Sequence, residues 1–502
     1  MASHDGKWAL FWVSLTILAT WTFLQVIYNL FGHPLSRFAG PRHFAASRIP
    51  YVYTSFSGRL AVKFHELHTE YGSVVRTAPN ELSFIEPSAW RTIYDRKNEH
   101  QTPFRKNYDS FNETRSQIRR SMYLAGDQEH ARMRKILSHA FSPGALRSQE
   151  PLLQKHVREL MEGVDHERLN NKGIVDLEKW YSWIAFDMIG DTSFGEPFNC
   201  ISEPDHRSWP LMLSRVRKVI TGVSGLKSIA PSLPLLQYLL PGSILQKSVL
   251  QHVVNALAFD LGKVKDRIAS KPSRGDVLSS IVQHNHENGS LDDTEIMANA
   301  SLFILAGTET VATLLSAVTY FLTQNPGALR NLAEEIRGNF KDESLLTAQN
   351  LAHTPYLTAC LEEAMRLVPP VPEGLPRVTP PEGEYICGHW VPGGTFVQIS
   401  TLAANLSLSN FTDPLSFIPE RWLATSPHSC TSDRKQASQP FSTGPRNCIG
   451  QALALSEVRL VIAKIIRRYD LRCIMQDSWT DQPTYLLWDR KPLLVELIPV
   501  ID

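Results

Sequence analysis

The feature that most restricts what this chain can fold into is a ten-residue pattern near its C-terminus, FSTGPRNCIG at residues 441–450. It fits the template F-x-x-G-x-R-x-C-x-G at every fixed position, which chance produces about once in 10⁶–10⁷ windows. Glycine lets the backbone pass close to a flat cofactor. Backbone N–H groups and the start of a following helix stabilise a thiolate, here at Cys448. The alternative is an inert core thiol, which is common for a lone cysteine. The pattern favours a sulfur ligand.

The remaining cysteines and the overall charge narrow the class of protein. The six cysteines are scattered, with no CxxC pair and no zinc-like grouping. This usage suits a reduced, cytosol-facing compartment better than a disulfide framework. The net charge of +1 gives no indication of a nucleic-acid partner.

The N-terminal segment Trp8–Phe31 has 24 residues and no charge. A helix of that length is about 36 Å long, enough to cross the ~30 Å hydrocarbon core of a bilayer. The alternative is a cleaved signal peptide, but the apolar run exceeds the usual ~7–15 residues and no small-residue cleavage site follows. Basic residues lie mainly after the segment, so the rest of the chain is expected to face the cytosol. These residues are Arg37, Arg42 and Arg48, against Lys7 alone before it.

The chain is expected to form one large domain behind this anchor. Residues 1–31 are the predicted membrane anchor and residues 32–50 a stiff, proline-rich connector. Residues 51–502 show no internal repeat and no linker long enough to separate two domains.

Hydrophobic periodicity predicts a mainly α fold with a small β region. The helices with the best start and stop signals are Glu129–Phe141, Asp292–Thr323, Thr354–Leu367 and Gly450–Tyr469. Short strands are expected near Val74–Arg76, Glu81–Ile85 and Thr395–Ile399. The apolar segment Leu226–Pro241 is either a buried loop or a second membrane contact.

With these features the chain resembles the cytochrome P-450 haem-thiolate enzymes over nearly its whole length. The resemblance implies a single large haem-thiolate fold that binds haem b. It makes Cys448 the axial ligand of the iron and lets Arg446 pair with a haem propionate. Phe441 and Gly450 of the same loop belong to the implied cofactor-binding set.

A second motif, AGTET at residues 306–310, lies in the long apolar helix. It is similar to the family's oxygen-activation motif, in which a small residue and Gly307 leave room for O₂. Thr310 would hydrogen-bond the bound O₂, and Glu309 would relay protons from solvent. Without the resemblance, an acid in such a run must be paired or in contact with water, and a satisfied core hydrogen bond is the alternative. Val311 stands where many relatives carry a second hydroxyl, which implies a leaner relay.

A third element is an E-x-x-R pair. Alone it is a weak sequence signal, because any i,i+3 ion pair on a helix matches it. Three pairs match: Glu129/Arg132, Glu334/Arg337 and Glu363/Arg366. Only the third lies in an apolar helix ended by prolines and precedes PERW at 419–422, which resembles the family's PERF box with Trp for Phe. The resemblance implies a buried structural network in which Glu363 bridges Arg366 and Arg421.

Three further bases resemble residues at the edges of the haem. His130 and Arg134 lie four residues apart on one predicted helix, and many relatives carry Trp at the first position. Arg377 resembles a propionate-binding arginine. The alternative for each is a solvated surface base.

The implied reaction is insertion of one oxygen atom from O₂ into a lipophilic substrate. The chain has no Gly-rich dinucleotide fingerprint, so NADPH would act through a separate NADPH-cytochrome reductase, with cytochrome b5 as a further candidate donor. Arg132, Lys135 and Arg446 are expected at the docking face. The resemblance places the anchor in the endoplasmic reticulum membrane.

The segments at residues 28–37 and 130–142 look like fungal members related to benzoate and trichothecene hydroxylases. This implies a terpenoid, polyketide or alkaloid intermediate of secondary metabolism as substrate. Pocket residues are expected near 100–125, 200–240, 300–310 and 371–376. Two other functions are considered: a haem-thiolate isomerase or dehydratase without a reductase, and a non-catalytic haem sensor or carrier. The pair Glu309–Thr310 argues against both.

Overall fold

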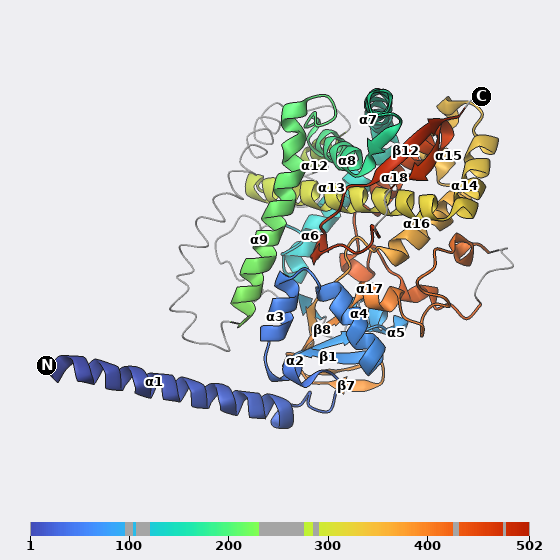
Figure 1. The fold of residues 1–502 in the computed structure, drawn as a ribbon. Helices are drawn as coiled ribbons and strands as arrows, with labels where there is room; N and C mark the ends of the chain where they lie inside the picture. Colours follow the sequence, from blue (N-terminus) through green and yellow to red (C-terminus); the bar gives the residue numbers. More distant parts are fainter. Residues whose placement is uncertain are drawn as a thin grey trace.

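The structure is a computed structural model that describes residues 2–95, 104–106, 121–229, 276–284, 291–424, 431–474 and 478–500. Long helices stack at one end of the body, and the largest sheet lies at the other end, near the N-terminal helix (Figure 1). The expectation of a mainly helical fold with small sheets is confirmed.

The longer helices are α1 (Ala2–Ile27), α4 (Leu60–Tyr71), α6 (Asp127–Leu137), α7 (Pro143–Asn170), α8 (Leu177–Phe194), α9 (Trp209–Ile229), α13 (Asp293–Gln324), α14 (Pro326–Asn339), α16 (Pro355–Leu367) and α18 (Gln451–Arg468). The shorter ones are α2 (Arg42–Ala46), α3 (Ile49–Phe56), α5 (Pro87–Tyr94), α12 (Val277–His284), α15 (Ala348–Leu351) and α17 (Thr401–Asn405). A π-helical turn, η1 (Tyr28–Gly32), follows α1. The 3-10 turns are η4 (Ser138–Phe141), η5 (Pro204–Ser208), η7 (Glu343–Leu345), η8 (Pro419–Trp422), η9 (Lys435–Ala437) and η10 (Gly444–Arg446).

The strands form two small sheets and two hairpins. The larger sheet has the order β1 (Val74–Ala78), β2 (Glu81–Phe84), β8 (Phe396–Ile399), β5 (Arg377–Val378), β3 (Arg105–Lys106), with β2 and β8 parallel. The second has the order β4 (Ile174–Asp176), β12 (Leu494–Pro499), β9 (Tyr469–Cys473). The hairpins are β6 (Glu384–Ile386) with β7 (His389–Val391) and β10 (Thr484–Tyr485) with β11 (Leu487–Trp488).

Helix α13 forms the centre of the core because it is apolar around its circumference. It packs against α8, α14, α16 and α18, whose apolar side chains join it in one buried cluster. Its start is fixed by a capping box between Asp292 and Glu295. Its end coincides with Asn325, the residue before a proline.

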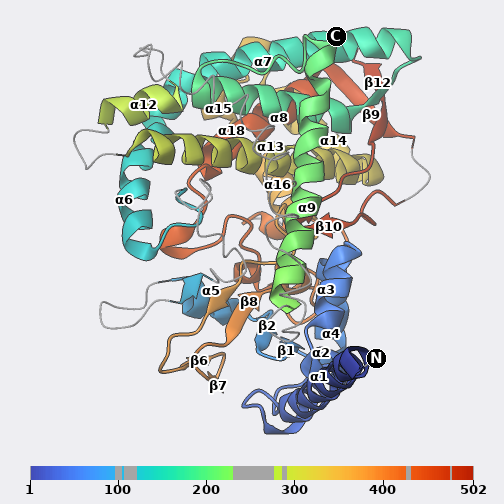
Figure 2. The same cartoon turned by 90° about the vertical axis from the view of Figure 1, so that its left-hand side faces the viewer.

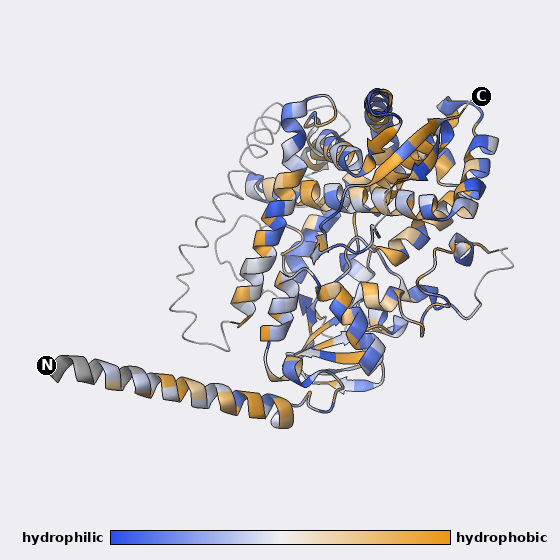
Figure 3. Ribbon diagram, viewed as in Figure 1, coloured by the Kyte–Doolittle hydropathy of each residue, from blue (hydrophilic) through white to orange (hydrophobic). Residues whose placement is uncertain are grey.

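Two helices of the described chain are long and apolar enough to cross a membrane, and they differ in burial. The span within α13 is 72% buried and belongs to the core. The span Trp12–Gly32 is only 6% buried, and its apolar helix projects away from the body (Figure 3). Exposed apolar residues of this kind fit a membrane anchor.

The predicted elements lie within a few residues of the observed ones. The helix predicted over Glu129–Phe141 begins two residues before its predicted start. Its last predicted turn is the 3-10 turn η4. The segment 32–50, expected as a connector, packs on the domain. Leu35 and Phe44 are buried, and a Cβ on Gly40 would lie 2.5 Å from the carbonyl oxygen of Arg76. Leu226–Ile229 complete α9, and the rest of the segment to Pro241 lies outside the described residues.

Candidate functional site

Cys448 lies in the loop between η10 and α18, two residues before the Gly450 cap of that helix. Its backbone N–H donates to the Phe441 carbonyl at 2.9 Å, which closes the loop. Burial raises the pKa of the Cys448 thiol, while the Gly450 N–H and the charge of Arg134 lower it. The residue is nevertheless exposed to water. The space in front of this exposed sulfur is called the hollow at Cys448 below.

Helix α13 borders the same hollow. Ala306 is exposed although most of the helix around it is buried, and Thr310, one turn further on, is half-buried. The Thr310 hydroxyl donates to the Ala306 carbonyl at 2.6 Å. Phe303 of α13 and Ile449, next to Cys448, pack in one apolar cluster, so the cysteine loop and the helix face one another.

The room beside α13 comes from Ala306 and not from the neighbouring glycine. A Cβ on Gly307 would lie 2.7 Å from the Ile189 side chain of α8, so Gly307 allows the close packing of the two helices. The expectation that Gly307 leaves space for O₂ is therefore corrected. Gly444 likewise serves packing: its φ is +76°, and a Cβ would lie 2.2 Å from the Tyr94 carbonyl oxygen. At Gly450 a Cβ would meet only Phe141, at 3.8 Å.

Several basic residues gather at one edge of the hollow, and among the described residues the acid beside them is Asp127. Lys106 of β3 lies directly opposite Arg377 of β5, a like-charge pair that destabilises a sheet unless an anion lies between. Burial, then Arg377 and Arg446, lower the pKa of Lys106 well below its usual value. Burial and neighbouring cations, Arg446 first, lower the pKa of His130 to about 4. Arg446 binds Asp127 and the Ala125 carbonyl, but its Nη1 is buried without a hydrogen-bond partner.

This cluster fits the two propionates of a haem. Two carboxylates would neutralise the facing cations and satisfy the orphaned guanidinium nitrogen. Across the described ranges no group of three or more His, Cys, Asp or Glu could hold a metal ion directly.

Arg134 contacts the cysteine loop. It donates to the backbone carbonyl and side chain of Asn447, at 2.7 and 2.5 Å. In this structure it holds the cysteine loop beside Cys448, and its contact with a propionate stays a prediction. Phe441, half-buried, packs from the same loop against the main core.

The acid of the second motif is held by two arginines. Glu309 is 2% exposed and accepts from Arg217 of α9 at 2.6 Å and from Arg490 at 3.0 Å. Burial alone would raise the pKa of Glu309, but Arg490 and Arg217 outweigh it and lower the pKa. Arg490 is itself fixed by Glu178 and Ser182 of α8. The carboxylate is thus buried and paired, and its role in a proton relay stays a prediction.

Behind the cysteine loop, Glu363 bridges Arg366 and Arg421, and all three side chains are fully buried. Its oxygens accept from Arg366 at 2.7 and 2.8 Å and from Arg421 at 3.0 Å. The Trp422 indole N–H also donates to Glu363, at 2.8 Å, a bond that the usual Phe of this box cannot make. In the first E-x-x-R pair of the sequence, by contrast, Glu129 pairs with Arg132 near the surface.

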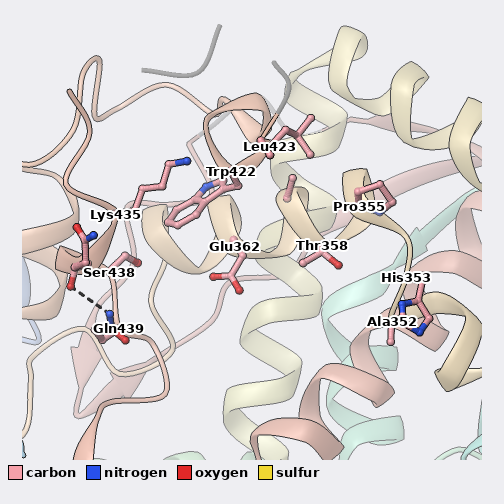
Figure 4. A pocket seen from close by; sticks show the side chains of 13 residues that line it. Ala352, His353, Pro355, Thr358, Glu362, Trp422, Leu423, Lys435, Ser438 and Gln439 are labelled. Carbon is pink, nitrogen blue, oxygen red and sulfur yellow. Dashed lines mark hydrogen bonds between the residues drawn. The ribbon is translucent and has the colours of Figure 1, made fainter. Parts of the chain in front are cut away.

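A separate pocket opens at the surface beside α16 and η9 (Figure 4). Its lining includes Glu362, Trp422 and Lys435 and none of the expected haem-binding residues. It is therefore distinct from the hollow at Cys448.

Sequence reasoning missed the side chains that come from distant segments. Lys106, Arg217 and Arg490 lie in no recognisable motif, and each is an ordinary base in its local sequence. Only a buried environment distinguishes them, and the sequence near them does not show it.

A single cysteine in a loop that faces a long core helix, beside a cluster of bases, is the site expected of a haem-thiolate protein. Residues 46–497 match the model of the cytochrome P450 family, and the chain belongs to that family. It is a cytochrome P450 monooxygenase. Membership implies a haem bound through a thiolate, O₂ and a reductase partner.

The chain is similar over almost its full length to fungal monooxygenases. It is 39% identical to cytochrome P450 monooxygenase atr2 of Stereocaulon alpinum, over 99% of this chain and 96% of that protein. It is 39% identical to cytochrome P450 monooxygenase lcsI of Purpureocillium lilacinum, over 95% and 92%. It is 37% identical to averantin hydroxylase of Dothistroma septosporum, over 98% and 92%.

Proposed function

We propose that this chain inserts one oxygen atom from O₂ into a lipophilic small molecule of fungal secondary metabolism. A terpenoid, polyketide or alkaloid intermediate is the expected substrate, and NADPH supplies electrons through a separate reductase. The observation that carries the proposal is Cys448 in a loop that faces α13, beside a cluster of bases in which Arg446 Nη1 is buried without a hydrogen-bond partner. The similarity to a named hydroxylase supports the reaction class.

Haem b would be held by Cys448 on one side and by propionate contacts from bases at the edge. These bases are Lys106, His130, Arg134, Arg377 and Arg446. An iron–thiolate centre supplies the activation of O₂. The Gly450 N–H bonds the sulfur, and Arg134 fixes the loop that carries it.

Thr310 and Glu309 are the proposed catalytic residues. The Thr310 hydroxyl borders the hollow, so turning it away from the Ala306 carbonyl would let it donate a hydrogen bond to oxygen. Glu309 stays ionised while both arginines hold it. A proton can pass through this carboxylate only after Arg217 or Arg490 withdraws, because a doubly paired carboxylate is a poor base.

We further propose one catalytic domain, residues 51–502, anchored by a single helix in the endoplasmic reticulum membrane and facing the cytosol. The exposed α1 supports the anchor. Reductase or cytochrome b5 would dock near α6, where Lys135 is exposed. Arg132 and Arg446, expected there too, are held by Glu295 and Asp127, so the face carries less free positive charge than expected.

The reduced CO complex tests the proposal directly. The wild type should show the thiolate-type spectrum, and Cys448→Ala should abolish it. A wild type without that spectrum would remove the haem-thiolate assignment.

Consumption of NADPH with reductase and substrate separates the remaining functions. The monooxygenase consumes NADPH and forms product. Product formed without any reductase would indicate the isomerase or dehydratase instead. Haem that binds ligand without turning it over would indicate a sensor or carrier.

A further inference from the structure

Helix α9 reaches the acid of the second motif through the side chain of Arg217. Figure 2 shows α9 crossing in front of α13, with its lower end beside α3 and β10 at its side. The Arg217 guanidinium, 4% exposed, donates to the Glu309 carboxylate of α13 at 2.6 Å. It also donates to the carbonyl of Trp488, the last residue of β11, at 3.1 Å. Arg217 therefore joins α9, α13 and β11 at one buried point.

Apart from this point, α9 is held to the core mainly near its N-terminus. Leu213 is buried in an apolar cluster with side chains of α8 and α13. Between Arg217 and Ile229, none of the described α9 side chains is buried. This part of the helix packs on α3, where a Cβ on Gly222 would lie 3.0 Å from the Phe56 ring. Arg217 is thus the buried contact that ties the middle of α9 to α13.

The second cation at Glu309, Arg490, is held by more contacts. Besides the carboxylate, its guanidinium donates to the Glu309 backbone carbonyl at 3.1 Å and to the Thr313 hydroxyl at 3.2 Å. Glu178 and Ser182 of α8 accept from the same guanidinium, both at 2.9 Å. Because α8 and α13 pack together in the core, Arg490 cannot leave Glu309 without losing contacts to both helices.

Of the two arginines, Arg217 is therefore the one that can withdraw. Among the described residues, the Glu309 carboxylate is the one group of α8 or α13 to which Arg217 donates. An outward shift of α9 would break this contact and leave those of Arg490 intact. The carboxylate would then keep its place with one cation instead of two. Because each paired cation weakens a carboxylate as a base, Glu309 would accept a proton more readily in that state.

We propose that Arg217 is a positioning residue that makes proton uptake by Glu309 depend on the place of α9. With α9 against α13 the carboxylate is doubly paired and does not accept protons. With α9 displaced it passes them toward Thr310. This inference rests on the proposed monooxygenase function and names the control of its proton supply. A closed relay limits the wasteful reaction in which NADPH, H⁺ and O₂ give NADP⁺ and H₂O₂.

Hydrogen exchange of the full-length holoenzyme tests the contact without turnover. Arg217→Met removes the charge and keeps a long side chain. Backbone amides of α9 should then exchange about tenfold faster, as expected for the loss of a hydrogen bond between charged groups. Glu309→Gln should act in the same direction. The double variant should exchange no faster than Arg217→Met alone, because both changes remove the same contact.

Arg215→Met is the matched control. Arg215 is exposed on the same helix, two residues away, so α9 should exchange in this variant as it does in the wild type. If Arg217→Met does not retain haem, Arg217→Lys takes its place, because it keeps the charge on a shorter side chain. A smaller increase in exchange is then expected.

Reductase-supported turnover tests what the contact controls. Without substrate, Arg217→Met should consume NADPH several-fold faster than the wild type and form hydrogen peroxide, whereas Arg215→Met should match the wild type. Adding Glu309→Gln to Arg217→Met should cancel this increase, because the carboxylate that Arg217 restrains is then gone. A purely structural role of Arg217 would not be reversed in this way.

Unchanged exchange of α9 in Arg217→Met would overturn the inference. Faster exchange without faster NADPH consumption would also overturn it, as would an increase in consumption that persists with Glu309→Gln. If the wild type gives no thiolate-type CO spectrum, or forms product without any reductase, the proposed function itself is wrong.

Discussion

At Cys448, opposing local effects act on the pKa of the thiol. Burial raises the pKa of the thiol, and the Gly450 N–H and Arg134 lower it. A bound metal cation would deprotonate the thiol outright. The loop therefore favours the thiolate only when the cofactor is in place, which couples haem binding to the charge of the ligand.

Thr310→Ala should leave haem binding unchanged but divert electrons to hydrogen peroxide, because the side chain facing the hollow loses its only donor. We expect the ratio of product to NADPH consumed to fall several-fold. It is measured by quantifying both, with peroxide, in reductase-supported turnover.

Thr323→Ala is the matched control for this prediction. Thr323 lies near the end of the same helix, and its hydroxyl bonds only the Tyr320 carbonyl. Coupling in this variant should equal that of the wild type. Unchanged coupling in Thr310→Ala would contradict the assigned role.

At the scale of elements, identical motifs acquire different roles from their burial. Glu129 and Glu363 both begin an E-x-x-R pair, but Glu129 is 59% exposed and Glu363 is fully buried. An exposed ion pair is screened by water, whereas a buried one leaves a bare charge when a partner is lost.

Glu363→Ala should therefore destabilise the fold by about 3–5 kcal/mol, because it strands the guanidinium groups of Arg366 and Arg421. Glu129→Ala should cost about 0–1 kcal/mol. Urea unfolding followed by circular dichroism measures both free energies. Equal losses in the two variants would mean that the buried bridge adds nothing.

Helix α18 carries a buried acid that makes stability depend on pH. Burial raises the pKa of Glu457 to about 8, and one of its oxygens has no hydrogen-bond partner. The folded state therefore binds the proton more tightly than the unfolded state. Stability from this group is complete below about pH 4.3, is lost as pH rises, and stays constant above about pH 8.

Glu457→Gln should remove this slope, because the amide is neutral at every pH. Melting temperatures between pH 5 and 8, compared with the wild type, report the difference. The exposed Glu334→Gln is the control and should follow the wild type. A Glu457→Gln curve parallel to the wild type would show that the carboxyl is not protonated in the fold.

At the scale of the whole molecule, the anchor and the catalytic body are nearly independent. Helix α1 is almost wholly exposed, whereas Asn29 in the turn after it bonds the Ala46 carbonyl at 2.9 Å. The body thus keeps its own contacts when α1 is removed at residue 27.

Deleting residues 2–27 should leave the CO spectrum intact and abolish most sedimentation with liposomes. Any affinity for liposomes that remains in this variant tests whether the segment Leu226–Pro241 contacts the membrane. No remaining affinity would exclude it as a second membrane contact. Loss of the spectrum would show that α1 supports the fold.

The sequence alone predicted the sulfur ligand and the anchor and located the main helices, since these signals are local: a ten-residue loop, helix caps and hydrophobic periodicity. It also singled out Glu363 among the three E-x-x-R pairs, because prolines end its helix and the PERW motif follows it in the sequence. Only the tertiary structure decided how Glu309 is held. Its partners Arg217 and Arg490 lie 92 and 181 residues away. The charge of a buried group depends on neighbours that folding brings together, and no local pattern records them.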